Sequence, residues 1–480
     1  MAVSGLLLAN LLYLVTGIGV VALVGSAATA RDVFRLLGLA YLAGIAVAGI
    51  VAAELALVDV PLNLSRLVAL AGFAAAAGGV RLRRSAPRPA KARASGFGGG
   101  RAVAIAAAVQ SVLLLGVAAT GFAVRPIAEW DAWAVWGIRA RALYELGGAN
   151  NPVFFSHLYT THDLDYPLFL PALEATGFHA MHRLNESLIH LQLLGIAIGF
   201  AATLWALLRP RVSAELTALG VLAVIAAPPV LGLLGTDYAD VPLALFVAAG
   251  LVALVRWIDE ADGRLLVWAG LFLAAGALTK NEGAMFAIAA FVVAIAVLLT
   301  RAPRRVLQLA LCAVCTLAPL VPWRLFLRVH HVRNVSFDLA NATNPRYLSA
   351  HAGRVGPTVH ALLHQIGVTR FGLLVPLVVA ALVTAVLSRQ TVLAGFVAAW
   401  LVLAFGALVT IYWISPQPLN WYLGTSAYRT VVTLVVAAAS LAPLLVAATW
   451  QEVAEAWAAR QAADPPLVPS DKVSLGHSDA

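Results

Sequence analysis

Five short motifs in this 480-residue chain carry side chains that could do chemistry. Each motif lies where a long apolar run is interrupted. The motifs are Glu129-Trp130-Asp131-Ala132-Trp133, Asp165-Tyr166-Pro167, Asp237-Tyr238-Ala239-Asp240, Thr279-Lys280-Asn281-Glu282-Gly283 and Ser426-Ala427-Tyr428-Arg429. Carboxylates can act as general bases, and guanidinium or ammonium groups can hold a phosphate. The motifs therefore indicate a reaction centre, which the apolar segments must position.

The composition places these segments in a membrane. Hydrophobic residues make up 61% of the chain and charged residues 11%, and the mean hydropathy is +0.89. Apolar stretches such as residues 33–57, 103–124, 187–208 and 283–299 approach or exceed the ~20 residues that cross ~30 Å of hydrocarbon. Lipid offers the backbone no hydrogen-bond partner, so such segments are helices. We expect an all-α polytopic bundle of about thirteen spans.

The basic residues predict the orientation of the bundle. They fall in alternate connections, which the positive-inside rule assigns to the cytoplasm. They are Arg31 and Arg35; Arg81, Arg83, Arg84, Arg88, Lys91, Arg93 and Arg101; Arg209 and Arg211; Arg256 and Arg264; Arg301, Arg304 and Arg305; and Arg389. All five motifs then lie outside. The net charge of +9 reflects topology, and no patch interleaves aromatic with basic residues as a nucleic-acid groove does.

The same pattern divides the chain into three parts. Residues 1–102 are predicted to hold N-terminal spans and a basic cytoplasmic linker, residues 103–450 a transmembrane catalytic core, and residues 451–480 a partly disordered cytoplasmic tail. External loops are expected at 125–186, 327–365 and 413–428. Loops longer than ~15 residues are usually functional.

The first long loop contains a predicted interfacial helix that begins after Asp131. An apolar face at three- and four-residue spacing is formed by Trp133, Trp136, Ala140 and Leu143. Arg139 and Arg141 fall off this face, as expected for a helix lying along the membrane surface. Asp131 has two interpretations, a helix N-cap or a catalytic base, and both can hold together.

The same loop contains His157, His162, Asp163 and Asp165. Imidazole and carboxylate groups at this density are potential ligands of a divalent metal. Their spacing matches no defined zinc or calcium loop, which favours a site without metal. The sequence leaves the metal open.

Lysine and arginine near the outer helix ends have competing interpretations. The chain has three lysines, and Lys280 is the one between two apolar spans. Ionisable residues in that setting are functional candidates, whereas the structural alternative pairs Lys280 with Glu282 or an aspartate. Arg324 and Arg429 could extend to lipid headgroups or grip a phosphate.

Taken in order, the motifs with Trp136 resemble those of bacterial GT-C glycosyltransferases, in the branch related to protein O-mannosyltransferases and the lipid A aminoarabinose transferase. The resemblance spans residues 129–429. It implies transfer of a sugar from a polyprenyl-phosphate donor, outside the cytoplasmic membrane of a bacterium, to a glycan, lipid or protein acceptor. It further implies inversion at the anomeric carbon, with Asp131 as base or acceptor-orienting carboxylate.

The resemblance also implies a substrate-binding set around Asp131. Its members would bind the donor phosphate, the sugar or the acceptor among membrane lipids, without nucleic acid. They are Glu129, Trp133, Trp136, Asp165, Tyr166, Asp237, Asp240, Lys280, Glu282, Arg324 and Arg429.

Two other classes of function remain as alternatives. A secondary transporter or flippase is favoured by the polar set Lys280, Asn281 and Glu282. Transporters usually show paired repeats and helices broken near the membrane centre, and neither is evident in the sequence. A scaffold without chemistry would leave the Trp-Asp-Ala-Trp and Lys-Asn-Glu sets without a purpose.

Overall fold

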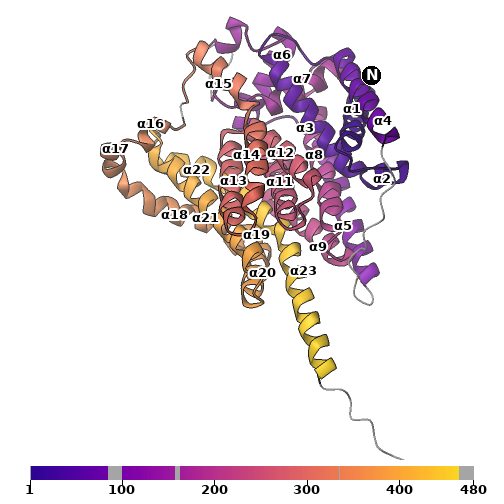
Figure 1. The fold of residues 1–480 in the computed structure, drawn as a ribbon. Helices are drawn as coiled ribbons and strands as arrows, with labels where there is room; N and C mark the ends of the chain where they lie inside the picture. The colour runs from indigo at the N-terminus through magenta and orange to yellow at the C-terminus, as the bar shows by residue number, and fades with distance from the viewer. Residues whose placement is uncertain (1, 85–99, 157–162, 335, 464–480) are drawn as a thin grey trace, which may run out of the picture.

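The computed structural model describes residues 2–84, 100–156, 163–334 and 336–463. Within these ranges all regular structure is helical, which confirms the predicted all-α class (Figure 1). The predicted linker between residues 85 and 99, His157, His162 and the tail from residue 464 lie outside the described residues.

The helices of the first half of the chain lead to the central helix α11. They are α1 (Ala2–Leu23), α2 (Ala30–Arg35), α3 (Leu37–Ala56), α4 (Leu64–Arg83), α5 (Gly100–Phe122), η1 (Ala132–Gly137), α6 (Ile138–Leu146), η2 (Pro152–Phe155), α7 (Phe169–Met181), α8 (Glu186–Leu208), α9 (Ala214–Ile225), α10 (Pro228–Leu234) and α11 (Asp240–Glu260).

The second half of the chain continues around α11, with α16 to α18 forming an arm at the side of the bundle (Figure 1). Its helices are α12 (Gly263–Thr279), α13 (Asn281–Arg301), η3 (Pro303–Arg305), α14 (Val306–Leu317), α15 (Leu320–Val329), α16 (Leu339–Ala342), α17 (Pro345–Ala350), η4 (Ala352–Arg354), α18 (Val355–Ile366), α19 (Val368–Phe371), α20 (Leu374–Leu387), α21 (Thr391–Ile414), α22 (Leu419–Thr430) and α23 (Val432–Ala463).

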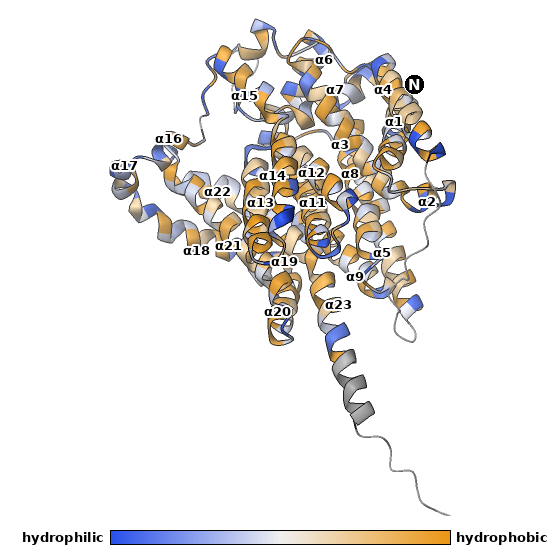
Figure 2. Ribbon diagram, viewed as in Figure 1, coloured by the Kyte–Doolittle hydropathy of each residue, from blue (hydrophilic) through white to orange (hydrophobic). Residues whose placement is uncertain are grey.

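Nine of the described helices are long and apolar enough to cross a membrane, counting α22 with α23 as one. Two bent pairs, α9 with α10 (58°) and α14 with α15 (42°), raise the number to eleven. The predicted count of about thirteen is not confirmed, and α12 and α20 are shorter apolar helices. Apolar residues dominate the helices in Figure 2, and large apolar side chains such as Phe73 and Val402 are exposed. This is a multi-pass membrane protein.

Helix α11 is the centre of the bundle, because every residue from Asp240 to Trp257 is buried. A helix that is apolar all round belongs in a core. Its 21 residues span about 30 Å at 1.5 Å per residue. Asp240 at its start and Glu260 at its end therefore mark opposite ends of the bundle.

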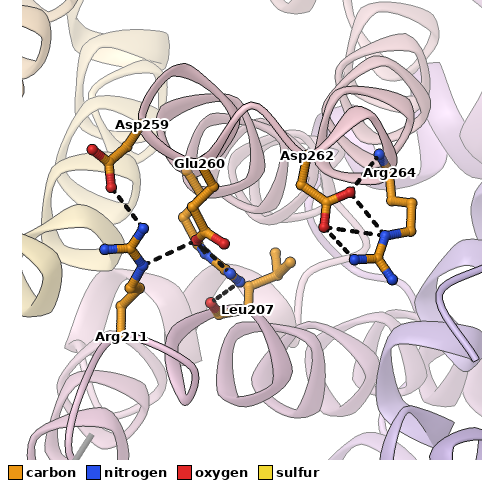
Figure 3. Close-up of polar contacts among 7 residues, drawn as sticks. Leu207, Arg211, Asp259, Glu260, Asp262 and Arg264 are labelled. Atoms are coloured by element: carbon orange, nitrogen blue, oxygen red, sulfur yellow. Dashed lines mark hydrogen bonds and ion pairs between the residues drawn. The ribbon is translucent and has the colours of Figure 1, made fainter. Parts of the chain in front are cut away.

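The Glu260 end is held by an ion network (Figure 3). Glu260 lies 2.6 Å from Arg256 and 3.3 Å from Arg211, which also lies 2.9 Å from Asp259. Arg256 donates in addition to the Leu207 carbonyl at 2.6 Å. These contacts tie the turn after α8 to the end of α11, so the arginines used to predict orientation have local structural partners here.

At the opposite end, α12 and α13 are separated by a single extended residue, Lys280, with φ −154° and ψ 154°. Close helix packing beside this break depends on Gly283. A Cβ at Gly283 would lie 2.0 Å from the carbonyl oxygen of Gly276 in α12. The glycine of the Thr-Lys-Asn-Glu-Gly motif therefore permits the approach that positions Lys280.

Replacing Gly283 with alanine should force α13 away from α12 and lower the free energy of unfolding by about 1–3 kcal/mol, as overpacking does. The matched control is Gly395→Ala in α21, where an added Cβ meets nothing within 4 Å. Thermal unfolding in detergent measures both. Equal midpoints for the two variants would contradict this account of the motif glycine.

Candidate functional site

Asp131 forms an ion pair with Arg429, from Oδ2 to Nη2, across most of the chain. Asp131 directly precedes η1, a π-helical segment, and its side chain makes no capping hydrogen bond. The N-cap interpretation is therefore wrong for the side chain. Arg429 lies in the last turn of α22. The pair joins the first long loop to the C-terminal helices.

The π-helical turn changes which residues of this segment face inward. Trp136 is 1% exposed and its ring lies 5.2 Å from that of Tyr166, whereas Trp133 is 44% exposed. Arg139 was expected on the polar face, but it is fully buried and donates to the carbonyls of Tyr166 (2.8 Å) and Asp163 (3.2 Å). A π turn holds more residues than an α turn, so the expected spacing shifts along the segment.

Lys280 is the centre of a buried charge cluster. Its Nζ lies 2.8 Å from Asp240 Oδ1, 3.3 Å from Glu282 Oε1 and 5.7 Å from the centre of the Tyr166 ring. All three charged side chains are less than a tenth exposed. Burial alone would lower the pKa of Lys280, but the two carboxylates outweigh it and raise the pKa. The pairing that the structural alternative predicted is confirmed.

Asp165 begins a chain of hydrogen bonds to α13 and α15. Asn281 Nδ2 donates to its Oδ2 at 2.6 Å, and Arg324 Nη2 donates to Asn281 Oδ1 at 2.9 Å. Trp323 Nε1 donates to the Asp165 carbonyl at 3.1 Å. Burial raises the pKa of the Asp165 carboxyl to about 6, with the neighbouring charge of Asp163 adding to the rise.

Tyr238 connects the ion pair to the lysine cluster. Arg429 Cζ lies 4.8 Å from the centre of the Tyr238 ring, within the range of a cation–π contact. Two residues further along the chain, Asp240 pairs with Lys280. One polar site is thus built from the first loop, the start of α11, the α12–α13 break and α22.

Three predicted site residues have other contacts or burial than the contacts that define this site. Glu129 pairs with Arg125 at 2.7 Å, and Trp133 packs edge-on against Trp130 at 4.9 Å. Asp237 is fully buried.

Sequence reasoning missed several members of the site. Asn281 and Tyr238 belong to the quoted motifs, so their positions beside Lys280 and Asp240 were a usable signal. Tyr412 had no such signal because it ends an apolar run. Its hydroxyl lies 2.8 Å from Ser426 Oγ and 3.3 Å from Thr430 Oγ1.

A divalent metal has no evident site in the described part of the chain. Among those residues no group of three or more His, Cys, Asp or Glu side chains could hold an ion. Two of the expected ligands, His157 and His162, fall outside the described residues.

An apolar groove of about 590 Å³ lies between α18, α20, α21 and α23. Its lining includes Val378, Leu382, Phe405, Val409, Leu434 and Ala438. Thr410 and Trp413 also line it, on either side of Tyr412 in sequence. The groove lining thus includes the residue next in sequence to Tyr412, which contacts α22.

Residues 165–325 match the model of a family described as dolichyl-phosphate-mannose-protein mannosyltransferase. This segment is a glycosyltransferase domain of the GT-C type. It contains Asp165, Asp240, Lys280 and Arg324, and it covers about a third of the chain. No curated protein and no solved structure matches the chain. The predicted resemblance, which spanned residues 129–429, is confirmed for residues 165–325, and this match supports a membrane glycosyltransferase of the GT-C kind.

Replacing Lys280 with methionine should cost about 3–5 kcal/mol of unfolding free energy, because it leaves buried carboxylates without a cation. Adding Asp240→Asn should restore part of the loss. The control Arg141→Ala removes an exposed ion pair with Glu145 and should cost at most about 1 kcal/mol. Denaturant titration in detergent measures all three. A loss for Lys280→Met no greater than that of the control would contradict the cluster's role.

Proposed function

We propose that this glycosyltransferase moves a sugar from a polyprenyl-phosphate donor to an acceptor hydroxyl, with Asp131 as the base or acceptor-orienting carboxylate. The observation that carries the proposal is the Asp131–Arg429 ion pair beside the mannosyltransferase-type segment. It combines a carboxylate and a guanidinium, the two groups that such a transfer needs.

Exposure distinguishes Asp131 from the other acids of the site. Its side chain is 28% exposed, whereas Asp240 and Asp165 are each 2% exposed. A general base must come within hydrogen-bond reach of the proton that it abstracts. Asp131 is therefore the acid that a substrate hydroxyl can approach, and the buried acids serve to hold the site.

The transfer follows from these groups. The acceptor oxygen attacks the anomeric carbon of the donor sugar, and its proton passes to the Asp131 carboxylate. The bond between the anomeric carbon and the phosphate oxygen breaks, and the polyprenyl phosphate leaves with the bonding electrons. Attack opposite the leaving group inverts the anomeric carbon, as the resemblance implies.

Arg429 is placed to stabilise the departing phosphate. Its Nη2 pairs with Asp131, while its Nε is buried and has no hydrogen-bond partner in the described structure. A guanidinium can bind a phosphate through such an N–H, and a donor aimed at developing charge lowers the barrier. Arg324 is the second candidate for binding the donor phosphate, because it is exposed and donates to Asn281. Lys280 is less suited to this role, since it already pairs with two carboxylates.

The apolar groove supports a lipid-linked donor. Leu434 of the groove follows Arg429 by five residues in the adjoining helices α22 and α23, which is about 8 Å of helix rise. A prenyl tail in the groove would bring its phosphate to Arg429. Burying each CH₂ group contributes about 0.8 kcal/mol. The prenyl tail would therefore supply binding free energy that the sugar-phosphate group of the donor need not provide.

We also propose that the Asp131 end faces out of a bacterial cytoplasmic membrane. The arginine-rich connections lie at the opposite end of α11, and the positive-inside rule assigns them to the cytoplasm. Residues 103–450 would then form the catalytic core, with residues 125–186, 327–365 and 413–428 outside.

Purified protein incubated with radiolabelled polyprenyl-phosphate sugars tests the proposal. We expect the wild type to release or transfer sugar, and Asp131→Asn to reduce the rate about 10²–10⁴-fold, the usual contribution of acid–base catalysis. Glu145→Gln changes an exposed carboxylate of the same loop and should retain the rate. Full activity in folded Asp131→Asn would remove Asp131 from the mechanism, and a wild type inert toward every donor would contradict the donor class.

A further inference from the structure

Glu174 of α7 and Asp237 form a buried pair of carboxyl groups that the proposed transfer does not use. Both residues are 0% exposed, and their side chains lie against each other within hydrogen-bond reach. None of their four carboxylate oxygens accepts a hydrogen bond from a donor group in the described residues. Among the residues that the structure describes, no cation is bonded to the pair.

Two adjacent carboxylates cannot both stay charged in such a place. An isolated buried carboxylate is so costly that it takes up a proton instead, and two acids that share a site retain one proton between them. Burial raises the pKa values of both groups. Asp237 raises the pKa of Glu174 further, whereas the hydrogen bond from Glu174 partly offsets the rise in the pKa of Asp237.

Ionisable groups of the elements around α7 do not offset this. They include Tyr13 of α1, Glu54 of α3, Arg66 of α4, Arg139 of α6, and Glu186 and His190 of α8. Arg139 is occupied by backbone carbonyls. Glu186 adds a further negative charge that raises the pKa of Asp237.

The pair is connected to the candidate site through the backbone. Asp237 has a positive φ of 63°, which is uncommon for a residue other than glycine and marks a constrained position. The next residue, Tyr238, lies under Arg429, and Asp240 pairs with Lys280. A contact that fixes Asp237 therefore also fixes the turn that carries the side chains of Tyr238 and Asp240.

We propose that Glu174 and Asp237 share one proton, and that this hydrogen bond positions the turn carrying Tyr238 and Asp240 in the site. Glu174 and Asp237 are then positioning residues that contact no substrate. The effect on transfer rests on the proposed function, whereas the shared proton can be measured without substrate.

Thermal unfolding as a function of pH tests the shared proton. Because the folded state binds the proton more tightly than the unfolded chain, its stabilising effect is complete only below the ordinary pKa of a carboxyl group, and it is lost progressively as pH rises from there to the raised pKa. The wild-type midpoint should therefore fall as pH rises through this range and level off above the raised pKa. Glu174→Gln and Asp237→Asn replace the shared proton with an amide donor that does not titrate, so each should remove that fall.

Glu145→Gln, which changes an exposed acid, should keep the wild-type dependence. Infrared spectra give a second readout: a protonated carboxyl band present at neutral pH should disappear in each amide variant. If both amide variants fail to fold, the wild-type spectra decide alone. Absence of this band at neutral pH overturns the proposal, and loss of the band at the pH where the fall in midpoint ends supports it. The same fall in midpoint with pH in wild type and both folded variants also overturns it.

The positioning role has its own readout, the pH profile of sugar transfer. Loss of the shared proton should lower the turnover number of the wild type as pH rises past the raised pKa, and the amide variants should keep their turnover number over the same range. An inert wild type that still shows the amide-sensitive stability profile would refute the proposed function alone. If transfer is normal and its turnover number changes with pH in the same way in wild type and both amide variants, the positioning role alone is refuted.

Discussion

The buried charge of Lys280 is the constraint on which the polar site depends. A single cation near the end of a membrane bundle must be neutralised, and Asp240 and Glu282 do so from α11 and α13. Neutralising the charge of Lys280 fixes the start of α11, the break between α12 and α13, and the position of the Tyr166 ring. Gly283 makes the arrangement possible by letting α13 approach α12. The ion cluster therefore acts as a frame for the reaction centre.

The reactive pair is attached to this frame but belongs to other parts of the chain. Asp131 comes from the first long loop and Arg429 from α22, and Tyr238 links them to the turn before Asp240. Neither member of the pair lies in the segment that matches the mannosyltransferase family, residues 165–325. The matched segment thus contains the frame, while the proposed base and phosphate ligand lie outside it. Partial exposure of Asp131 beside nearly buried acids gives the site one approachable carboxylate.

Much of the fold could be predicted from the sequence because lipid imposes strong local rules. Long apolar runs must be helical, and the five motifs occur where those helices end. Pairings between distant residues had no such local signal. The partner of Asp131 lies about 300 residues away, and the contact of Asp237 with Glu174 depends on how α7 packs. The burial of Arg139 was mispredicted because a π-helical turn does not follow α-helical spacing.

The most direct test of the account is the binding of a non-transferable polyprenyl-phosphonate sugar to purified wild type, Arg429→Lys and Asp131→Asn. Lysine keeps a positive charge beside Asp131 but lacks the planar fork that suits a phosphate. We expect Arg429→Lys to bind the analogue about tenfold more weakly, a difference of about 1.4 kcal/mol, and Asp131→Asn to bind it nearly as well as wild type. Equal affinity of wild type and Arg429→Lys would contradict the assignment of Arg429 to the donor phosphate.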